Sequence, residues 1–253
     1  MNAISLTLAS SLVLISIFIS YYQKLGVEKE IVVGTIRAVI QLTIVGYILH
    51  YIFAANNFFF TLAMVTVMII VAGNNAAKRG RGIPGVFYYI TVSIAIGTAI
   101  TLAILILFGT VHFRPQEVIP VAGMIIGNSM VSSGLTVSRL KDEMKNRTLE
   151  IQTALALGAS ARQAVQKILK ISLKTGMMPT IDGMKTLGIV QLPGMMTGLI
   201  LGGVDPINAV KYQIMVTFML ASTVAISCFC VTFLTYKEFF TPYHQLIVNG
   251  GGD

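Results

Sequence analysis

"VFYYITVSIAIGTAITLAILILF", residues 86–108, runs through the chain without one charged side chain. A helix needs about 20 mostly apolar residues to cross the hydrocarbon core of a bilayer. The whole chain shares this character: of its 253 residues, 55% are hydrophobic and only 11% are charged, whereas soluble domains carry about 25% charged residues. One soluble core of this length cannot bury so much apolar surface. The sequence therefore predicts an all-α, polytopic integral membrane protein.

Six further stretches resemble this one, so about seven transmembrane helices are expected. The seven predicted spans are 4–22, 31–53, 58–76, 86–108, 118–137, 180–202 and 211–235. The first lacks a basic region and a clear cleavage site, so we interpret it as a retained span. Pro193 interrupts the sixth and predicts a kink there. Residues 1–248 are expected to form one transmembrane domain, and residues 249–253 a disordered tail.

Basic residues predict the orientation of these spans. If the polar segment between the fifth and sixth spans is cytoplasmic, only Arg114 and Lys211 of the 18 Lys and Arg residues fall outside the cell. Cytoplasmic loops of membrane proteins carry an excess of Lys and Arg. We therefore expect the N-terminus outside and the C-terminus in the cytoplasm of a cell with this protein in its inner (plasma) membrane. The net charge of +8 is thus explained by topology, and no nucleic-acid partner is expected.

The segment 139–178 predicts a helix–bend–helix at the inner membrane surface. Gly158 is suited to a left-handed helix end, and Ser160 with Gln163 fits a capping box. Beyond the bend, aliphatic and basic residues alternate at helical spacing, which gives an apolar and a basic face. The apolar face is Val165, Ile168, Leu169 and Ser172, and the opposite face is Gln163, Lys167, Lys170 and Lys174. Two interpretations remain open: a helix anchored to anionic lipid, or a docking element for a cytosolic partner.

The stretch "QTALALGASARQAV", residues 152–165, resembles the coupling loop of ABC-transporter permeases, written EAA-x3-G. Gly158 and Ala154 match, whereas Gln152 and Thr153 replace the Glu and the first Ala. The Leu-Pro that importer permeases carry further on is absent. The resemblance implies contact between this loop and a cytosolic ABC ATPase subunit. The implied docking residues are Ala154, Leu157, Gly158, Ala159, Ser160 and Arg162.

Three other stretches together resemble the Fet-type permease family: "IRAVIQLTIVGYIL" (36–49), "IPVAGMIIGNSM" (119–130) and "LPGMMTGLILGGVDPINAVKYQI" (192–214). Bacterial members are described as iron-exporting ABC permeases. Plant relatives are half-size permeases linked to aluminium tolerance, with a nucleotide sugar proposed as cargo. The resemblance implies a homodimeric permease, paired with two ATPase chains that hold ATP and Mg²⁺, exporting iron or another metal cation.

The sequence lacks motifs that ATP hydrolysis and zinc binding require. No G-x-x-x-x-G-K-[ST] phosphate loop occurs, so the chain is not expected to hydrolyse ATP or to be an enzyme. The three histidines are scattered without zinc spacing, and no bound cofactor is expected. Cys228 and Cys230 are interpreted as packing residues, because positions i and i+2 of a helix point to different sides.

Polar side chains at membrane depth are costly and often mark a transport path. The expected path residues are Arg37, Gln41, Asn128, Ser129 and Gln191. Candidate metal ligands are Glu117, Asn128, Asp182, Met195 and Met196. Some of these residues, and the polar Asp205 near them in sequence, also have a purely structural interpretation. Arg37 can reach the membrane surface or pair with Asp182, Asp205 can cap an outer helix, and methionine is adaptable core filler.

Glycines recur every fourth residue at Gly123 and Gly127, and again at Gly194, Gly198 and Gly202. Such spacing serves close helix packing, within one chain or at a dimer seam.

Three rival functions also stay open. These are an ATP-independent secondary cation transporter or channel, an ABC permease for a nucleotide sugar, and a membrane scaffold.

Overall fold

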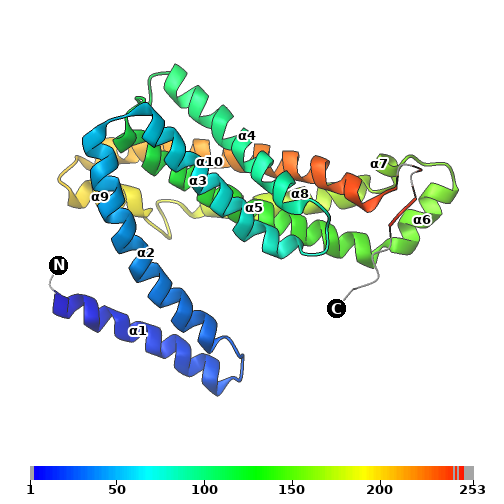
Figure 1. The fold of residues 1–253 in the computed structure, drawn as a ribbon, viewed down its shortest axis with the longest axis horizontal. Coiled ribbons are helices and arrows are strands. Elements are labelled where there is room, and N and C mark those ends of the chain that lie inside the picture. Colours follow the sequence, from blue (N-terminus) through cyan, green and yellow to red (C-terminus); the bar gives the residue numbers. More distant parts are fainter. Residues whose placement is uncertain (1–2, 242, 244, 248–253) are drawn as a thin grey trace. The chain divides into compact units, whose positions relative to one another are not determined.

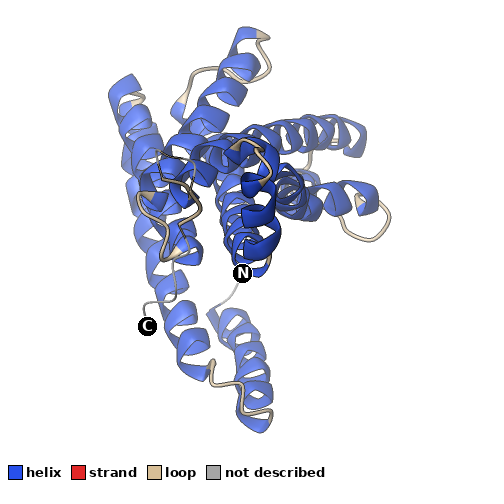
Figure 2. Cartoon of the chain, turned by 90° about the vertical axis from the view of Figure 1, so that its right-hand side faces the viewer, coloured by secondary structure: helices blue, strands red, loops and turns tan. Residues whose placement is uncertain are grey.

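A computed structural model describes residues 3–241, 243 and 245–247, with side chains described from residue 11 onward. The expected tail, residues 249–253, lies outside the described residues. Within the described part the chain consists of helices joined by loops, and no strand is formed (Figure 2). The all-α prediction is confirmed. The chain divides after Asn57 into two compact units.

The first unit is a pair of helices, α1 (Ala3–Tyr22) and α2 (Glu28–Ala55). The turn between them is closed by a hydrogen bond in which Ser20 Oγ donates to Glu28 Oε1 at 2.7 Å. Asn56 ends α2 in the left-handed conformation. No residue of α2 is buried within the chain. Its apolar surface is therefore of the kind that lipid or another protein chain covers.

The second unit contains the remaining elements (Figure 1). They are α3 (Phe58–Ala77), η1 (Lys78–Gly80), α4 (Val86–Leu107), α5 (Pro115–Asn146), α6 (Thr148–Ala156), α7 (Ala161–Ala164), α8 (Gln166–Thr186), α9 (Gly194–Leu201), α10 (Pro206–Thr235) and η2 (Tyr236–Phe239). The central helix is α5, which packs against α3, α4, α8 and α10. Branched aliphatic side chains such as Ile90, Ile125 and Val231 fill the space between them.

Small residues bring these helices close together. An added Cβ at Gly97 in α4 would lie 3.2 Å from the Thr223 carbonyl oxygen of α10. At Gly176 in α8 it would collide with Thr136 Oγ1 and lie 2.9 Å from the Ser132 carbonyl oxygen of α5. In both places one helix rests on the backbone of the next. Of the predicted packing glycines, Gly123 lies close to α3, where an added Cβ would be 3.2 Å from Met68 Cε. At Gly127, Gly194 and Gly198 an added Cβ meets no described atom within 4 Å.

Six of the seven expected spans coincide with long helices. Five of these are long and apolar enough to cross a membrane, namely α2, α3, α4, α5 and α10. In α1, the part with described side chains, Ser11–Tyr22, is also apolar. At 32 residues, α5 is about 48 Å long at 1.5 Å per residue. It therefore extends about 18 Å beyond a hydrocarbon core of about 30 Å. The segment predicted to start the coupling loop is the end of this helix.

The sixth expected span, 180–202, is wrong as a single helix. The structure ends α8 at Thr186, and α9 starts at Gly194 and has only eight residues. Between them, the Gly188 N–H donates to the Gln191 carbonyl oxygen at 3.0 Å, with Gly188 at φ +80°. Pro193 lies at the start of α9 and does not kink a helix interior. Two backbone features, a left-handed glycine and a proline without an N–H, therefore divide the predicted span.

Candidate functional site

The corner between α6 and α7 has the predicted cap geometry. Gly158 follows the end of α6 with φ +90°. Ser160 is the N-cap of α7, and its Oγ accepts a hydrogen bond from the Gln163 N–H at 3.4 Å. In return, the Ser160 N–H donates to Gln163 Oε1 at 2.8 Å. The predicted bend and capping box are both confirmed, so short-range hydrogen bonds hold the corner in one shape.

The surface of this corner is apolar at its tip. Leu157 is 83% exposed and Leu149, on α6, is 77% exposed. Ala154 and Ala159 are half-buried, whereas Gly158 and Ser160 are exposed. These two leucines provide exposed apolar area that a partner could cover.

The expected two faces beyond the bend are confirmed by burial. Val165, Ile168, Leu169 and Ser172 are buried. The side chains predicted on the opposite face are exposed: Gln163, Lys167, Lys170 and Lys174. The helix is not continuous, however, because Val165 separates the single turn of α7 from α8.

Ion pairs stabilise the junction of α5 and α6. Glu143 is only 6% exposed, and its two oxygens accept from Arg139 and Arg147, each at 2.6 Å. Arg147 also reaches Glu150 at 3.2 Å. The hydrogen bonds to Glu143 and then Glu150 raise the pKa of the Arg147 guanidinium. One carboxylate thus ties together the end of α5 and the residue that starts α6.

A cavity of about 250 Å³ lies between α5, α8, the 187–193 segment and α10. Its polar lining is Asn128, Thr180, Gln191, Gln213 and Thr217, and the remaining lining residues are glycine, proline, methionine and leucine. Asn128 stands 13 residues into α5, about 20 Å from its start, near the middle of the predicted span. The cavity therefore gathers uncharged polar groups between these helices, with Asn128 and Gln191 exposed.

Two predicted path residues, Asn128 and Gln191, line this cavity. Ser129 does not, because its hydroxyl is fully buried and accepts a hydrogen bond from Ser227 of α10 at 3.3 Å. Arg37 and Gln41 are exposed on α2 in the first unit. Within the second unit, the structure brings Asn128 and Gln191 together and leaves Ser129 outside the cavity.

Gln213 was missed by the sequence analysis. Its side-chain oxygen is buried without a hydrogen-bond partner among the described residues, and the side chain lines the cavity. A buried, unpaired amide oxygen is costly, so such groups usually face a ligand or water. Gln213 lies inside the predicted span 211–235. It stands near the start of that span, where the membrane-depth argument that selected Asn128 is weaker.

The metal-ligand candidates are spread over different places. Glu117 accepts from the backbone N–H of His112 at 2.7 Å and lies 3.3 Å from its ring Nδ1. Asp182 forms an ion pair with Lys185 at 3.0 Å, and Met195 packs against the core. Met196 is half-buried. Among the described residues, no group of three or more His, Cys, Asp or Glu side chains could hold a metal ion. Asp205 caps α10, as its alternative interpretation predicted.

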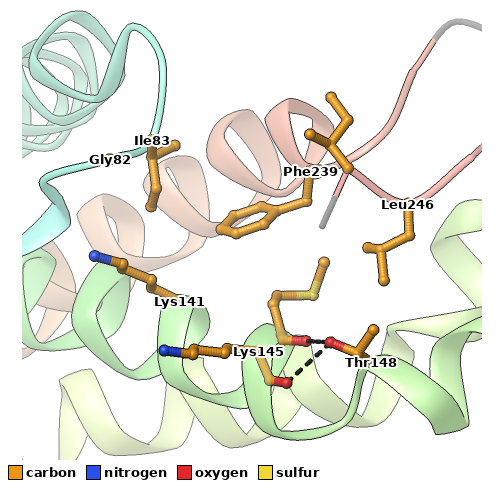
Figure 3. Close-up of a pocket in the computed structure, with 9 residues that line it drawn as sticks. Gly82, Ile83, Lys141, Lys145, Thr148, Phe239 and Leu246 are labelled. Atoms are coloured by element: carbon orange, nitrogen blue, oxygen red, sulfur yellow. Dashed lines mark hydrogen bonds between the residues drawn. The ribbon is translucent and has the colours of Figure 1, made fainter. Parts of the chain in front are cut away.

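A smaller cavity, about 70 Å³, lies where the end of α5 meets η2 and the C-terminal segment (Figure 3). Ile83, Met144, Phe239 and Leu246 give it apolar walls. Lys141 and Lys145 also line it, and Lys141 Nζ donates to the Arg81 carbonyl oxygen at 2.6 Å. None of the predicted path or metal residues is among its lining residues.

Long apolar helices around a cavity of uncharged polar side chains define a helical integral membrane protein with a polar site inside its bundle. The chain belongs to the family described as "Uncharacterised protein family (UPF0014)", which matches residues 3–240. This membership confirms the Fet-type resemblance.

Relatives match nearly the whole chain. The "Probable iron export permease protein FetB" of Escherichia coli (strain K12) is 46% identical over 96% of this chain and 94% of its own length. The "UPF0014 membrane protein YjkA" of Bacillus subtilis (strain 168) is 43% identical over 98% of this chain and 100% of its own. "Protein ALUMINUM SENSITIVE 3" of Arabidopsis thaliana is 38% identical over 92% and 86%. No solved structure matches significantly.

Proposed function

We propose that this chain is the permease subunit of an ABC exporter that moves iron out of the cell. In this proposal two copies of the chain form a homodimer in the plasma membrane, with the N-terminus outside and the C-terminus in the cytoplasm. Two separate ATPase chains bind ATP and Mg²⁺ and dock on the α6–α7 corner. The Escherichia coli relative named as an iron export permease supports the cargo.

The observation that carries the proposal is the course of α8. This helix starts at Gln166, just after the capped corner, and ends at Thr186, with Thr180, Gly183 and Met184 lining the polar cavity. One helix therefore connects the exposed apolar tip to the polar groups inside the bundle. Force applied to the corner by the ATPase is transmitted along α8 to the cavity. Such a rigid-body shift alternates access to the cavity from the two sides of the membrane.

Iron efflux with and without the partner tests this proposal. The chain is co-expressed with a candidate ATPase, and the purified complex is placed in liposomes. ATP-dependent iron(II) transport is expected, and it is lost when the phosphate-loop lysine of the ATPase is substituted. Equal transport with the inactive ATPase contradicts the proposal and favours a secondary transporter. ATP-dependent transport of a nucleotide sugar, without iron transport, contradicts the cargo alone.

A further inference from the structure

The chemistry of the 250 Å³ cavity restricts the form in which a metal ion can occupy it. Its lining contains amides, hydroxyls and one thioether, Met184, and no carboxylate, imidazole, thiolate or ammonium group among the described residues. Binding sites for dehydrated divalent iron are built from carboxylate, imidazole or thiolate ligands. Transferring a bare divalent ion into a site without such groups is unfavourable, because a few neutral amide and hydroxyl oxygens do not compensate for its lost hydration.

The same lining is suited to water bound to a metal. Water molecules on a cation donate hydrogen bonds, so the surrounding protein must accept them. Gln213 supplies a buried side-chain oxygen without a partner among the described residues. Asn128 Nδ2 donates to the Met124 carbonyl oxygen at 2.9 Å, which leaves its amide oxygen as an acceptor. The hydroxyl oxygens of Thr180 and Thr217, and the Gln191 amide, add further acceptors to the lining.

The size of the cavity agrees with this chemistry. Six water molecules at about 30 Å³ each occupy about 180 Å³. A cavity of about 250 Å³ therefore accommodates one metal ion with a complete first shell of six waters. It is larger than a dehydrated ion requires.

We infer that the cavity binds its cargo as a hydrated divalent cation, held through its water shell by the Gln213 oxygen and the neighbouring neutral acceptors. This inference rests on the proposed function for the choice of a metal cation as cargo. It assigns Gln213 a role in selection: its oxygen accepts from a coordinated water and does not bind the metal directly.

Hexaamminecobalt(III) is a direct probe of such a site. Its six ammine ligands exchange extremely slowly, so it can bind only through hydrogen bonds donated by its outer N–H groups. Calorimetric titration into the purified complex of the chain with its ATPase is expected to give saturable binding that iron(II) displaces. Gln213→Leu, which keeps the side-chain bulk and removes the acceptor, should raise the dissociation constant about tenfold. Gln213→Glu should lower it, because a carboxylate accepts more strongly.

One control variant separates the cavity from the rest of the molecule. Gln166→Leu removes an exposed amide from the same α8, 14 residues or about 21 Å from Thr180, and should leave the dissociation constant unchanged.

Absence of binding, or equal binding in wild type and Gln213→Leu, overturns the inference. So does X-ray absorption that shows protein nitrogen or sulfur bonded directly to iron(II) in the complex. Gln213-dependent binding without ATP-driven iron transport leaves the hydrated-cation site standing and refutes the proposed function. The two failures are therefore distinguishable.

Discussion

The guanidinium of Arg162 lies over the aromatic ring of Phe233, with its Cζ atom 5.3 Å from the ring centroid. This contact joins the single turn of α7 to the last turns of α10. Cation–π contacts at exposed sites contribute about 0.5–1 kcal/mol. The α6–α7 corner is thus attached to the helix that carries Gln213, in addition to its direct continuation into α8.

The first prediction concerns this pair. Arg162→Gln and Phe233→Leu should each lower the free energy of unfolding by about 1 kcal/mol, and the double variant should lose less than the sum. The coupling energy is expected near 0.5 kcal/mol, measured by unfolding the four proteins in detergent. Additive losses would show that the contact contributes no stability.

Gly158 provides a test of the docking corner. Its φ of +90° is unfavourable for side chains, although an added Cβ meets no described atom within 4 Å. Gly158→Val should therefore strain the backbone by about 1–2 kcal/mol and reduce co-purification with the ATPase. Membrane insertion should be unchanged. Gly34→Val is the matched control, since it lies in α2 with equally open space and no positive φ. Normal ATPase binding by Gly158→Val would refute docking through this bend.

The Glu143 network predicts a stability effect that is insensitive to pH near neutrality. Glu143→Gln should cost about 2 kcal/mol, because it weakens two charge-assisted hydrogen bonds of a buried group. Glu150→Gln should cost less than about 1 kcal/mol, since that pair is exposed. The raised pKa of Arg147 means that its contribution is complete below the ordinary arginine pKa and is lost only at higher pH. The cost of Arg147→Gln should hence be constant from about pH 6 to pH 9, as chemical unfolding would measure.

Asn128 and Ser129 are neighbours with different expected roles. Asn128 is exposed to the cavity, so Asn128→Ala should reduce cargo-stimulated ATPase activity several-fold while thermal stability changes little. Ser129 is buried against Ser227, so Ser129→Ala should cost about 1 kcal/mol of stability and keep activity per folded complex. Both quantities are measured on the same preparations. A reversed pattern would exclude the cavity as the path.

Orientation is tested by labelling single cysteines after Cys228 and Cys230 are replaced by alanine. His112 and Lys145 are both exposed and are predicted on opposite sides of the membrane. Cysteine at position 112 should react with an impermeant reagent in intact cells, and cysteine at position 145 only after permeabilisation. The opposite result would invert the predicted topology.

Local sequence patterns predicted several features of the structure correctly. Apolar length located six long helices, and capping chemistry located Gly158, Ser160 and Asp205, because these signals act within a few residues. The interruption of 180–202 was predicted only as a kink at Pro193, since hydropathy does not distinguish a kinked helix from two helices joined by an apolar loop. Ser129 and Gln213 show a second limit. Whether a polar residue faces a neighbour or a cavity depends on how helices distant in sequence are rotated against each other.

Gly176 is a point about which α8 can pivot on α5. It lies ten residues from Gln166 and ten from Thr186, at the point where α8 rests directly on the α5 backbone. Three residues later Pro179 lacks an N–H, so one helical hydrogen bond is missing close to this support. An α8 that pivots at Gly176 moves its cavity end about as far as its corner end, in the opposite direction. A push on the corner would then move Thr180 and Met184 in the opposite direction, so a pivot at Gly176 would couple the corner to the cavity between the helices.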